Sequence, residues 1–304
     1  MFCGWWLLQH LRMVRVIDED LLQQDLSRQI EKSGLMFRLF WRVKSIESIR
    51  HKMALKGEQY LSGQGLIQDI IGLRVVVYFP DDVDVLSTYF GCGDVVKQSI
   101  DEFDTSTFRP QRLNITRSLP EEYINDFRKA LPEEFAKYID STYEIQIRTV
   151  FSEGWHEVEH DMRYKCKKDW EGYDSQSRIL NGLIAQLETA EWSMRSLFRE
   201  MAVENCHRGN YRAMMRNKMR IRFKSEGFSS PVEEYLKANP SLCERFLMTD
   251  RMVIILSMII HKAVLPLSYD NILFLANRID MEDEGLKKLE SAETQKLIDT
   301  FIES

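Results

Sequence analysis

The 304-residue sequence lacks paired cysteine motifs, long apolar runs, repeats and an excess of basic charge. Its five cysteines show no CxxC spacing, which argues against a structural zinc site of the cysteine type and favours free thiols in a reducing, cytoplasmic compartment. The longest apolar run, residues 252–260, is far shorter than a membrane span, so we expect no membrane contact. The net charge of −6 argues against a surface that coats nucleic acid, but leaves a local basic site open.

The most informative stretch is residues 142–149, which alternate strictly between two sides. Tyr143, Ile145 and Ile147 share one side, and this period of two predicts a strand with a buried face. The other side carries a carboxylate, an amide and a guanidinium, from Glu144, Gln146 and Arg148. Such a set suits a metal ion and phosphates better than solvent.

The hydrophobic period changes directly after this strand and predicts a helix over residues 150–165. An apolar stripe is formed by Phe151, Trp155, Val158 and Met162. A neighbouring polar stripe is formed by Glu153, His156, His160 and Tyr164. A polar strand face that leads into a polar helix stripe could form one wall of an active site, although an edge strand followed by an ordinary surface helix would show the same pattern.

A basic cluster precedes this unit in the chain. Ser45 is a suitable cap for a helix over residues 45–53, whose first turn would favour anions. Three basic residues and a serine lie near the start of this helix: Arg42, Lys44, Ser48 and Lys52. Their spacing is Arg-x-Lys-x-x-x-Ser-x-x-x-Lys. A solvated basic face is the alternative.

Residues 68–80 form a nearly continuous apolar run, which predicts a strand buried on both faces. Asp69 at its start and Arg74 within it are costly in such surroundings unless they pair or bind a ligand. Two further strands are expected at residues 94–98 and 112–117. The remaining predicted elements are helices, at residues 1–40, 82–90, 121–138, 175–205 and throughout the tail.

These features together resemble the synthetase domain of the RelA/SpoT family, particularly the single-domain small alarmone synthetases. The resemblance covers roughly residues 37–200 and rests on four segments in one order: the cluster at 42–52, Asp69-Ile-Ile-Gly-Leu-Arg74, Glu144-Ile-Gln-Ile-Arg-Thr149, and Trp155 with Glu159-His160 and Tyr164-Lys165. It implies an α+β fold with a mixed β-sheet and flanking helices. We therefore expect a helical lead (1–36), a synthetase domain (37–205) and an all-helical C-terminal region (206–304).

The reaction implied by the resemblance moves the β,γ-pyrophosphate of ATP to the 3′-hydroxyl of GDP or GTP. Arg42 and Arg74 would then enclose the adenine, and the phosphates would be held by Lys44, Ser48 and Lys52. Asp69 and Glu144 would bind Mg²⁺, with Glu144 also near the acceptor hydroxyl. The acceptor side would be formed by Gln146, Arg148, His160, Tyr164, Lys165 and Arg112. A homo-oligomer is a further expectation from the family.

The sequence departs from the family on the acceptor side. Guanine-specific members carry a Gly-Tyr-x-Ser-x-His loop, which does not occur between Asp69 and Glu144. The corresponding stretch is residues 108–117, where Arg112 or Arg117 could stack on a base instead. This departure leaves two alternatives open: a toxin-like enzyme that modifies another 3′-hydroxyl, such as a tRNA end held by the basic segment 212–224, and a nucleotide or RNA sensor without turnover.

A competing motif lies in the helix over residues 150–165. His156-Glu157-Val158-Glu159-His160 matches the H-E-x-x-H signature of zinc proteases, with Glu188 or Glu191 as a conceivable third ligand. This hypothesis is the weaker one, because it gives no role to Asp69, Arg74 or the basic cluster.

Overall fold

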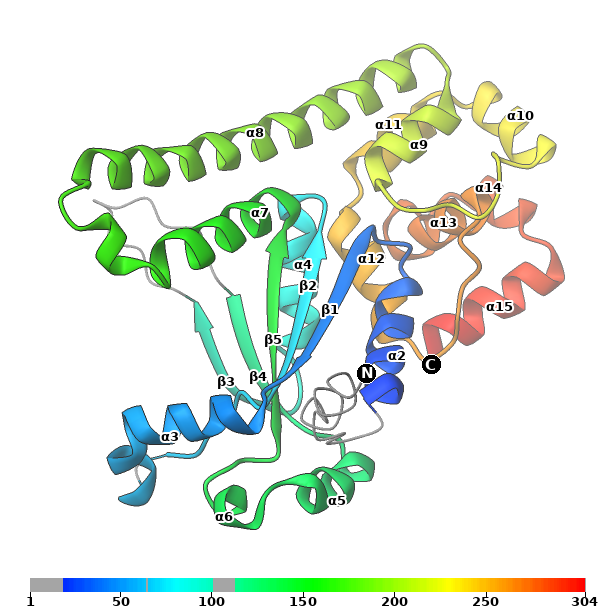
Figure 1. Ribbon diagram of the computed structural model, residues 1–304. Coiled ribbons are helices and arrows are strands. Elements are labelled where there is room, and N and C mark those ends of the chain that lie inside the picture. The colour runs from blue at the N-terminus through cyan, green and yellow to red at the C-terminus, as the bar shows by residue number, and fades with distance from the viewer. Residues whose placement is uncertain (1–18, 64, 101–112, 304) are drawn as a thin grey trace, which may run out of the picture.

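A computed structural model describes residues 19–63, 65–100 and 113–303. Its centre is a five-stranded mixed sheet with helices packed around it, and the C-terminal part of the chain adds a group of helices beside the sheet (Figure 1). The predicted α+β class with an all-helical C-terminal region is therefore confirmed. The predicted helix before residue 19 and the acceptor residue Arg112 lie outside the described residues.

The sheet has the order β1-β2-β5-β4-β3. Its strands are β1 (Phe37–Val43), β2 (Ile71–Val77), β3 (Val95–Ile100), β4 (Leu113–Ser118) and β5 (Thr142–Thr149). Only β2 and β5 run parallel; the other neighbours are antiparallel. The sequence marks these two strands most clearly, because β2 is a nearly continuous apolar run and β5 alternates strictly between apolar and polar residues.

One predicted element is wrong. The helix predicted over residues 1–40 includes residues 37–40, but these begin strand β1, which continues through Arg42 to Val43. The strand alternates between half-buried and exposed positions from Phe37 to Arg42 and ends on the buried Val43, and pairing with β2 supplies its backbone hydrogen bonds. The helical lead therefore ends earlier, with α2 (Glu19–Glu31).

Helices connect and flank the strands. The first group comprises α3 (Ile46–Leu61), α4 (Pro80–Phe90), α5 (Glu121–Ala130), α6 (Glu133–Ala136), α7 (Val150–Glu159), η1 (His160–Tyr164), η2 (Lys167–Trp170) and α8 (Asp174–His207). Pro132 divides the predicted helix 121–138 into α5 and α6, because proline disfavours the helical conformation of the residue before it. Both α4 and α7 pack against β2 and β5.

The C-terminal helices are α9 (Tyr211–Met219), α10 (Ser230–Ala238), α11 (Ser241–Met248), α12 (Arg251–Ile260), α13 (Tyr269–Ala276), η3 (Asn277–Met281), α14 (Glu284–Leu289) and α15 (Ala292–Glu303). They share a hydrophobic core with the sheet region, because α12 packs against α2 and α4 and one cluster of buried side chains extends from Leu22 to Phe301. At Gly34 (φ +71°), the backbone carbonyl accepts a hydrogen bond from Arg222 N, which ties the α2–β1 turn to the C-terminal region.

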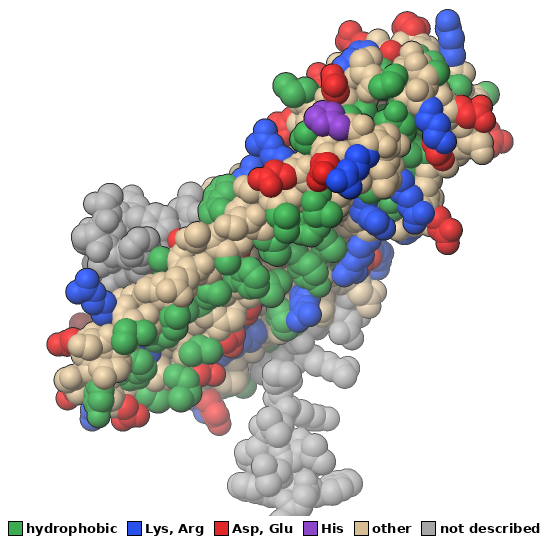
Figure 2. All heavy atoms as spheres, turned by 90° about the horizontal axis from the view of Figure 1, so that it is seen from above, with side chains coloured by type: hydrophobic (Ala, Val, Ile, Leu, Met, Phe, Trp, Pro, Cys, Tyr) green, Lys and Arg blue, Asp and Glu red, His purple; other side chains and the backbone are tan. Residues whose placement is uncertain are grey.

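The apolar stripe predicted for α7 is only partly buried, and α8 also exposes apolar side chains. Trp155 is buried as expected, but Val158 and Met162 are exposed, and so are Leu183 and Leu197 of α8. The buried positions of α8 are Ile184, Glu191, Ala202 and Cys206. Figure 2 shows hydrophobic side chains gathered on the surface along α8. The amphipathic period is correct for a helix, but it does not fix which stripe meets the rest of the protein.

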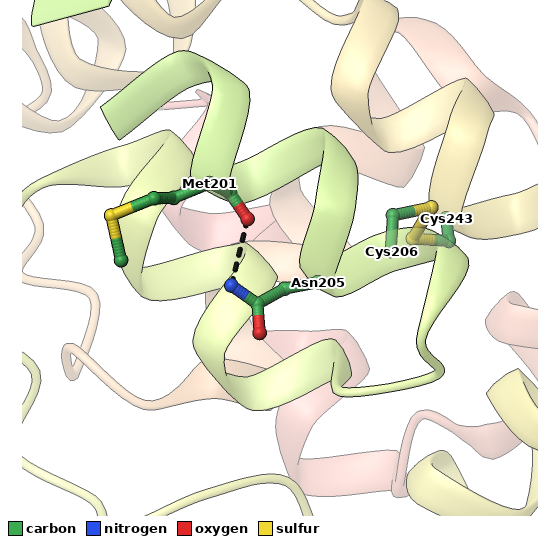
Figure 3. The surroundings of a disulfide bond; sticks show 4 residues. All are labelled: Met201, Asn205, Cys206 and Cys243. Atoms are coloured by element: carbon green, nitrogen blue, oxygen red, sulfur yellow. Dashed lines mark hydrogen bonds between the residues drawn. A yellow bond between two sulfur atoms is a disulfide. The ribbon is translucent and has the colours of Figure 1, made fainter. Parts of the chain in front are cut away.

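The prediction of free cysteines is wrong at two positions. Cys206 at the end of α8 and Cys243 in α11 form a disulfide, with a Cα–Cα distance of 5.9 Å (Figure 3). Cys92 and Cys166 are free thiols. Sequence spacing could not reveal this pair, because 37 positions separate the two residues and only the packing of α8 against α11 brings them together.

Among the described residues, no helix is long and apolar enough to cross a membrane.

Candidate active site

The register of the sheet brings four of the predicted site residues to one face. Arg42 of β1 lies opposite Gly72 of β2, which in turn lies opposite Glu144 of β5. Two residues further along, Arg74 of β2 lies opposite Gln146. Because side chains two residues apart on a strand point to the same face, these four side chains share it. Gly72 carries no side chain between Arg42 and Glu144.

An open cleft of about 610 Å³ lies over this face. Its size is within the range of small-molecule sites. Its walls come from β1, β2, β5, α7 and η1, and the polar residues that line it are Arg42, Lys44, Asp69, Arg74, Glu144, Gln146, Glu153, Glu157, His160, Asp161 and Lys165. The structure therefore gathers residues that are more than 120 positions apart in the sequence (42 to 165).

Asp69 is the centre of a small ionic cluster at the cleft. Lys44 donates a hydrogen bond of 2.6 Å to its Oδ2, and Lys52 one of 2.8 Å to its Oδ1. Burial alone would raise the pKa of Asp69, but the hydrogen bonds and charges of the two lysines hold that pKa below its ordinary value. Asp69 is therefore a carboxylate at neutral pH.

The helix that carries Lys52 starts as the sequence predicts. The Ser45 hydroxyl accepts a hydrogen bond of 3.2 Å from Ser48 N and caps α3. Ser48 and Lys52 line a second hollow that adjoins the cleft and shares Arg42, Lys44 and His160 with it. The predicted phosphate-binding set thus forms one continuous polar surface with the cleft.

A second ionic cluster connects the sheet to α7. Arg74 forms ion pairs with Glu153 and Glu157, and its Nε donates a hydrogen bond of 3.3 Å to Gln146. Arg148 donates to the other oxygen of Glu153, at 2.9 Å, and to Gln146, at 3.1 Å. Burial would lower the pKa of Arg74, but the two glutamates raise it above its ordinary value. Glu153 therefore neutralises two arginines at once.

Gln146 links this network to the predicted catalytic carboxylate. Its Nε2 donates a hydrogen bond of 3.0 Å to Glu144, while its Oε1 accepts from Arg74 and Arg148. An amide can do both, because it carries an acceptor and two donors on one rigid group. The position of Glu144 is thus coupled to that of the two arginines.

The residues after α7 complete one end of the cleft. The chain winds into a π-helical turn, η1, in which the rings of His160 and Tyr164 stack at 5.7 Å between centroids. Lys165 donates a hydrogen bond of 2.6 Å to Asp161. His160, Asp161 and Lys165 line the cleft, and Tyr164 lines the adjoining hollow. π-Turns occur frequently at functional sites.

Sequence reasoning missed the full role of two residues. In the sequence, Glu153 is one member of a polar stripe, and Glu157 appears only within the H-E-x-x-H match. The available signal was their spacing of four positions on a helix that directly follows a strand carrying Arg148. Arg117, the other candidate for the acceptor base, donates instead to the carbonyls of Phe90 and Cys92 and lies outside the cleft lining.

The zinc-protease hypothesis finds no support in the geometry. Within residues 19–63, 65–100 and 113–303, no group of three or more His, Cys, Asp or Glu side chains could hold a metal ion. His156 is buried, whereas His160 lines the cleft. Glu157 pairs with Arg74, and Glu191 accepts a hydrogen bond from Thr149.

The cleft does fit a magnesium ion that is shared with a substrate. Mg²⁺ in nucleotide enzymes is typically held by one or two carboxylates together with substrate phosphates, so a complete protein cage is not required. Asp69 and Glu144 supply the two carboxylates, and both line the cleft. Lys44 and Lys52, which neutralise Asp69 here, are the natural partners of phosphate oxygens.

Comparison with known families agrees with this site. Residues 41–169 match the family described as "Region found in RelA / SpoT proteins". We call this matched part of the chain the RelA/SpoT region. That region begins within β1, ends in η2 and includes all the polar residues that line the cleft. No curated protein sequence matches the chain.

Several solved structures are similar in part. A GTP pyrophosphokinase family protein from Streptococcus pneumoniae is 24% identical, with a TM-score of 0.42, over 64% of this chain and 95% of that one. The small alarmone synthetase 1 from Bacillus subtilis bound to its product pppGpp is 22% identical, with a TM-score of 0.44, over 64% of this chain and 97% of that one. The same synthetase bound to AMPCPP is 21% identical, with a TM-score of 0.41, over 63% and 97%.

Proposed function

We propose that the chain is an ATP:nucleotide 3′-pyrophosphokinase that makes (p)ppGpp from ATP and GDP or GTP. The observation that supports it best is the register of the sheet, which brings Arg42, Arg74 and Glu144 to one face beneath a cleft that also contains Lys44 and Asp69. The RelA/SpoT match over residues 41–169 supports the same reaction class.

In the proposed reaction, the acceptor 3′-oxygen forms a bond to the β-phosphorus of ATP. The bond between that phosphorus and the oxygen bridging to the α-phosphate breaks, and AMP leaves. Such transfers depend mainly on positioning and on neutralising phosphate charge. Lys44 and Lys52 would turn from Asp69 to the phosphates, and Ser48 would add a hydroxyl donor. Mg²⁺ held by Asp69 and Glu144 would neutralise the charge that develops on the phosphate oxygens.

Glu144 is the proposed acceptor of the hydroxyl proton. Its side chain accepts from Gln146, which keeps it beside the arginine network. Arg42 and Arg74 would enclose the adenine, which guanidinium planes attract by stacking and cation–π contacts. For Arg74, this requires that the ion pairs with Glu153 and Glu157 leave one face of its guanidinium plane open to the base. Arg148, His160, Tyr164 and Lys165 would form the acceptor side, together with Arg112.

The decisive experiment incubates the purified protein with γ-³²P-ATP and, separately, with GDP, GTP, ATP or tRNA as acceptor. We expect label transfer to GDP or GTP. Transfer only to tRNA would show that the acceptor is an RNA 3′ end and that the reaction is still pyrophosphate transfer. No transfer to any acceptor would contradict the proposed function.

The variant Glu144→Gln separates an enzyme from a nucleotide sensor. It should abolish transfer and leave ATP binding within about twofold, because the amide keeps the shape but cannot accept the proton or hold the metal. The exposed Glu121 in α5 gives a matched control, since Glu121→Gln makes the same change away from the cleft. Equal inactivity of wild type and Glu144→Gln, with ATP still bound, would favour the sensor.

A cytoplasmic location and a homo-oligomeric state belong to the same proposal. Light scattering of the purified protein tests the second. A mass equal to one chain of 36.0 kDa at micromolar concentration would contradict it.

A further inference from the structure

A second cavity of about 530 Å³ lies between α4, α8, α9, α11 and α12, away from the cleft. We call it the joint pocket. Its charged lining consists of Arg195, Arg199, Lys218, Arg220 and Arg251, with Asp81, Asp84 and Asp250. Figure 2 shows Lys and Arg side chains gathered beside the C-terminal half of α8. The RelA/SpoT region supplies only Asp81 and Asp84 to this lining.

The charges of the joint pocket are distributed unevenly. Three guanidinium groups from three separate segments, those of Arg195, Arg220 and Arg251, converge on a single oxygen, Oδ2 of Asp81. Arg251 also pairs with the fully buried Asp82, at 2.7 Å. One carboxylate oxygen cannot satisfy the donors of three arginines, each of which carries five N–H groups.

Arg220 shows this imbalance most clearly. Its side chain is only 7% exposed, and its Nε has no hydrogen-bond partner in the described part of the chain. It follows α9 in a left-handed conformation (φ 48°), which non-glycine residues adopt rarely. A buried guanidinium N–H without an acceptor is costly, so such a group is expected to meet an acceptor in the functional state.

Lys218 adds a further donor on the same side. Its Nζ donates to the carbonyls of Leu247 and Thr249, at 2.9 and 2.8 Å, so an ammonium with three N–H groups has one left. Burial, followed by the charge of Arg251, lowers the pKa of Lys218 to about 8. Burial is the main cause of this shift, and the charge of Arg251 adds to it.

The rim of the pocket is apolar. Val203 of α8 and Leu247, Met248 and Met252 of the α11–α12 segment line it, and Met248 is 86% exposed. Methionine side chains adapt readily to flat rings. The pocket thus combines convergent arginines with an apolar edge, as a phosphate joined to a base or sugar requires.

We propose that the joint pocket binds the phosphate group of a nucleoside phosphate, which displaces Asp81 from part of its contacts with Arg195, Arg220 and Arg251. This site is separate from the proposed catalytic cleft and does not depend on the proposed reaction. Its occupant would touch α4, which follows β2, and α8, whose Glu191 accepts a hydrogen bond from Thr149 of β5.

The test measures binding by isothermal titration calorimetry on the full chain, with AMP, GDP, inorganic phosphate and tRNA as separate probes. Titrations are repeated in Lys44→Ala/Lys52→Ala, which removes the phosphate-binding lysines of the cleft. We expect one nucleotide to remain bound in that variant. Adding Arg199→Glu/Lys218→Gln should weaken this remaining binding at least tenfold.

The matched control is Arg216→Glu, which reverses the charge of an exposed α9 residue outside the pocket lining and should change the affinity less than twofold. Arg199→Glu alone changes an exposed residue, so it tests the proposal if the double variant fails to fold. The proposal is overturned if nucleotide binding vanishes with the cleft lysines, if Arg216→Glu acts like Arg199→Glu, or if only tRNA binds. Equal affinity for inorganic phosphate and nucleotides would refute the nucleoside part.

Discussion

Glu153 and Glu157 offer a sharp test of the ionic network at the cleft, because both pair with Arg74 but differ in burial. Glu153 is 14% exposed and also pairs with Arg148, which is 8% exposed. Glu157 is 55% exposed and has Arg74 as its ion-pair partner among the described residues. The substitutions Glu153→Gln and Glu157→Gln remove one charge each at nearly constant volume.

The expected costs follow from this difference. Removing one partner of a buried ion pair leaves an uncompensated charge and typically costs about 3–5 kcal/mol. Because the glutamine can still accept one hydrogen bond from Arg148, we expect Glu153→Gln to lie near the lower end, at about 3 kcal/mol. An exposed ion pair contributes about 0–1 kcal/mol, so Glu157→Gln should cost less than about 1 kcal/mol.

Urea unfolding monitored by circular dichroism measures both values as changes of midpoint at constant slope. A double-mutant cycle adds Arg148→Met. Since the two residues share one interaction, we expect the double variant to be more stable than the sum of the single changes by at least about 1 kcal/mol. Equal losses for the two glutamates, or strict additivity in the cycle, would refute the argument that Glu153 is the buried partner of both arginines.

Three further predictions concern charge and covalent links. Asp69→Asn should abolish pyrophosphate transfer. Because Lys44 and Lys52 lower the pKa of Asp69, the free energy of unfolding of wild type should fall relative to that of Asp69→Asn as the pH is lowered through the range in which carboxyl groups titrate. The pKa of Lys218 is lowered from 10.5 to about 8, so the unfolded chain binds more protons than the folded chain between these pH values. The stability of wild type relative to Lys218→Met should therefore rise with pH across this window, by at most about 3 kcal/mol in urea titrations. A difference in stability that does not change with pH would contradict the burial of the amine. Cys206→Ser/Cys243→Ser opens a loop of 37 residues and should cost about 2–4 kcal/mol under oxidising conditions and nothing under reducing ones; equal loss in both would show that the disulfide does not form.

Much of the fold was predictable because strands and helices of strong period dominate the sheet region. The strict alternation over 142–149 coincides with β5, and the apolar run at 68–80 contains β2. Strand β1 was missed because Phe-Arg-Leu-Phe-Trp-Arg-Val mixes basic residues with apolar ones on an edge strand, where one row of backbone groups lacks a neighbour. Its identity depends on pairing with β2, which is a tertiary effect.

The candidate site was predictable only in part. The family resemblance supplied Arg42, Arg74, Asp69 and Glu144, and the sheet register explains why they meet. The partners that position them were not predictable, because the contact of Glu153 with Arg148 depends on the angle at which α7 leaves β5. The roles of these residues remain predictions that await the transfer assay.

The length of α8 has a practical consequence for anyone who wishes to study the RelA/SpoT region alone. A helix of 34 residues rises about 51 Å, and its last two turns hold the buried Ala202 and Cys206 among the C-terminal helices. A fragment that ends at residue 205 would therefore expose apolar surface at the end of α8. It would also lose the packing of α12 against α4. Point substitutions in the full-length chain are therefore the better way to inactivate one half than truncation or domain exchange.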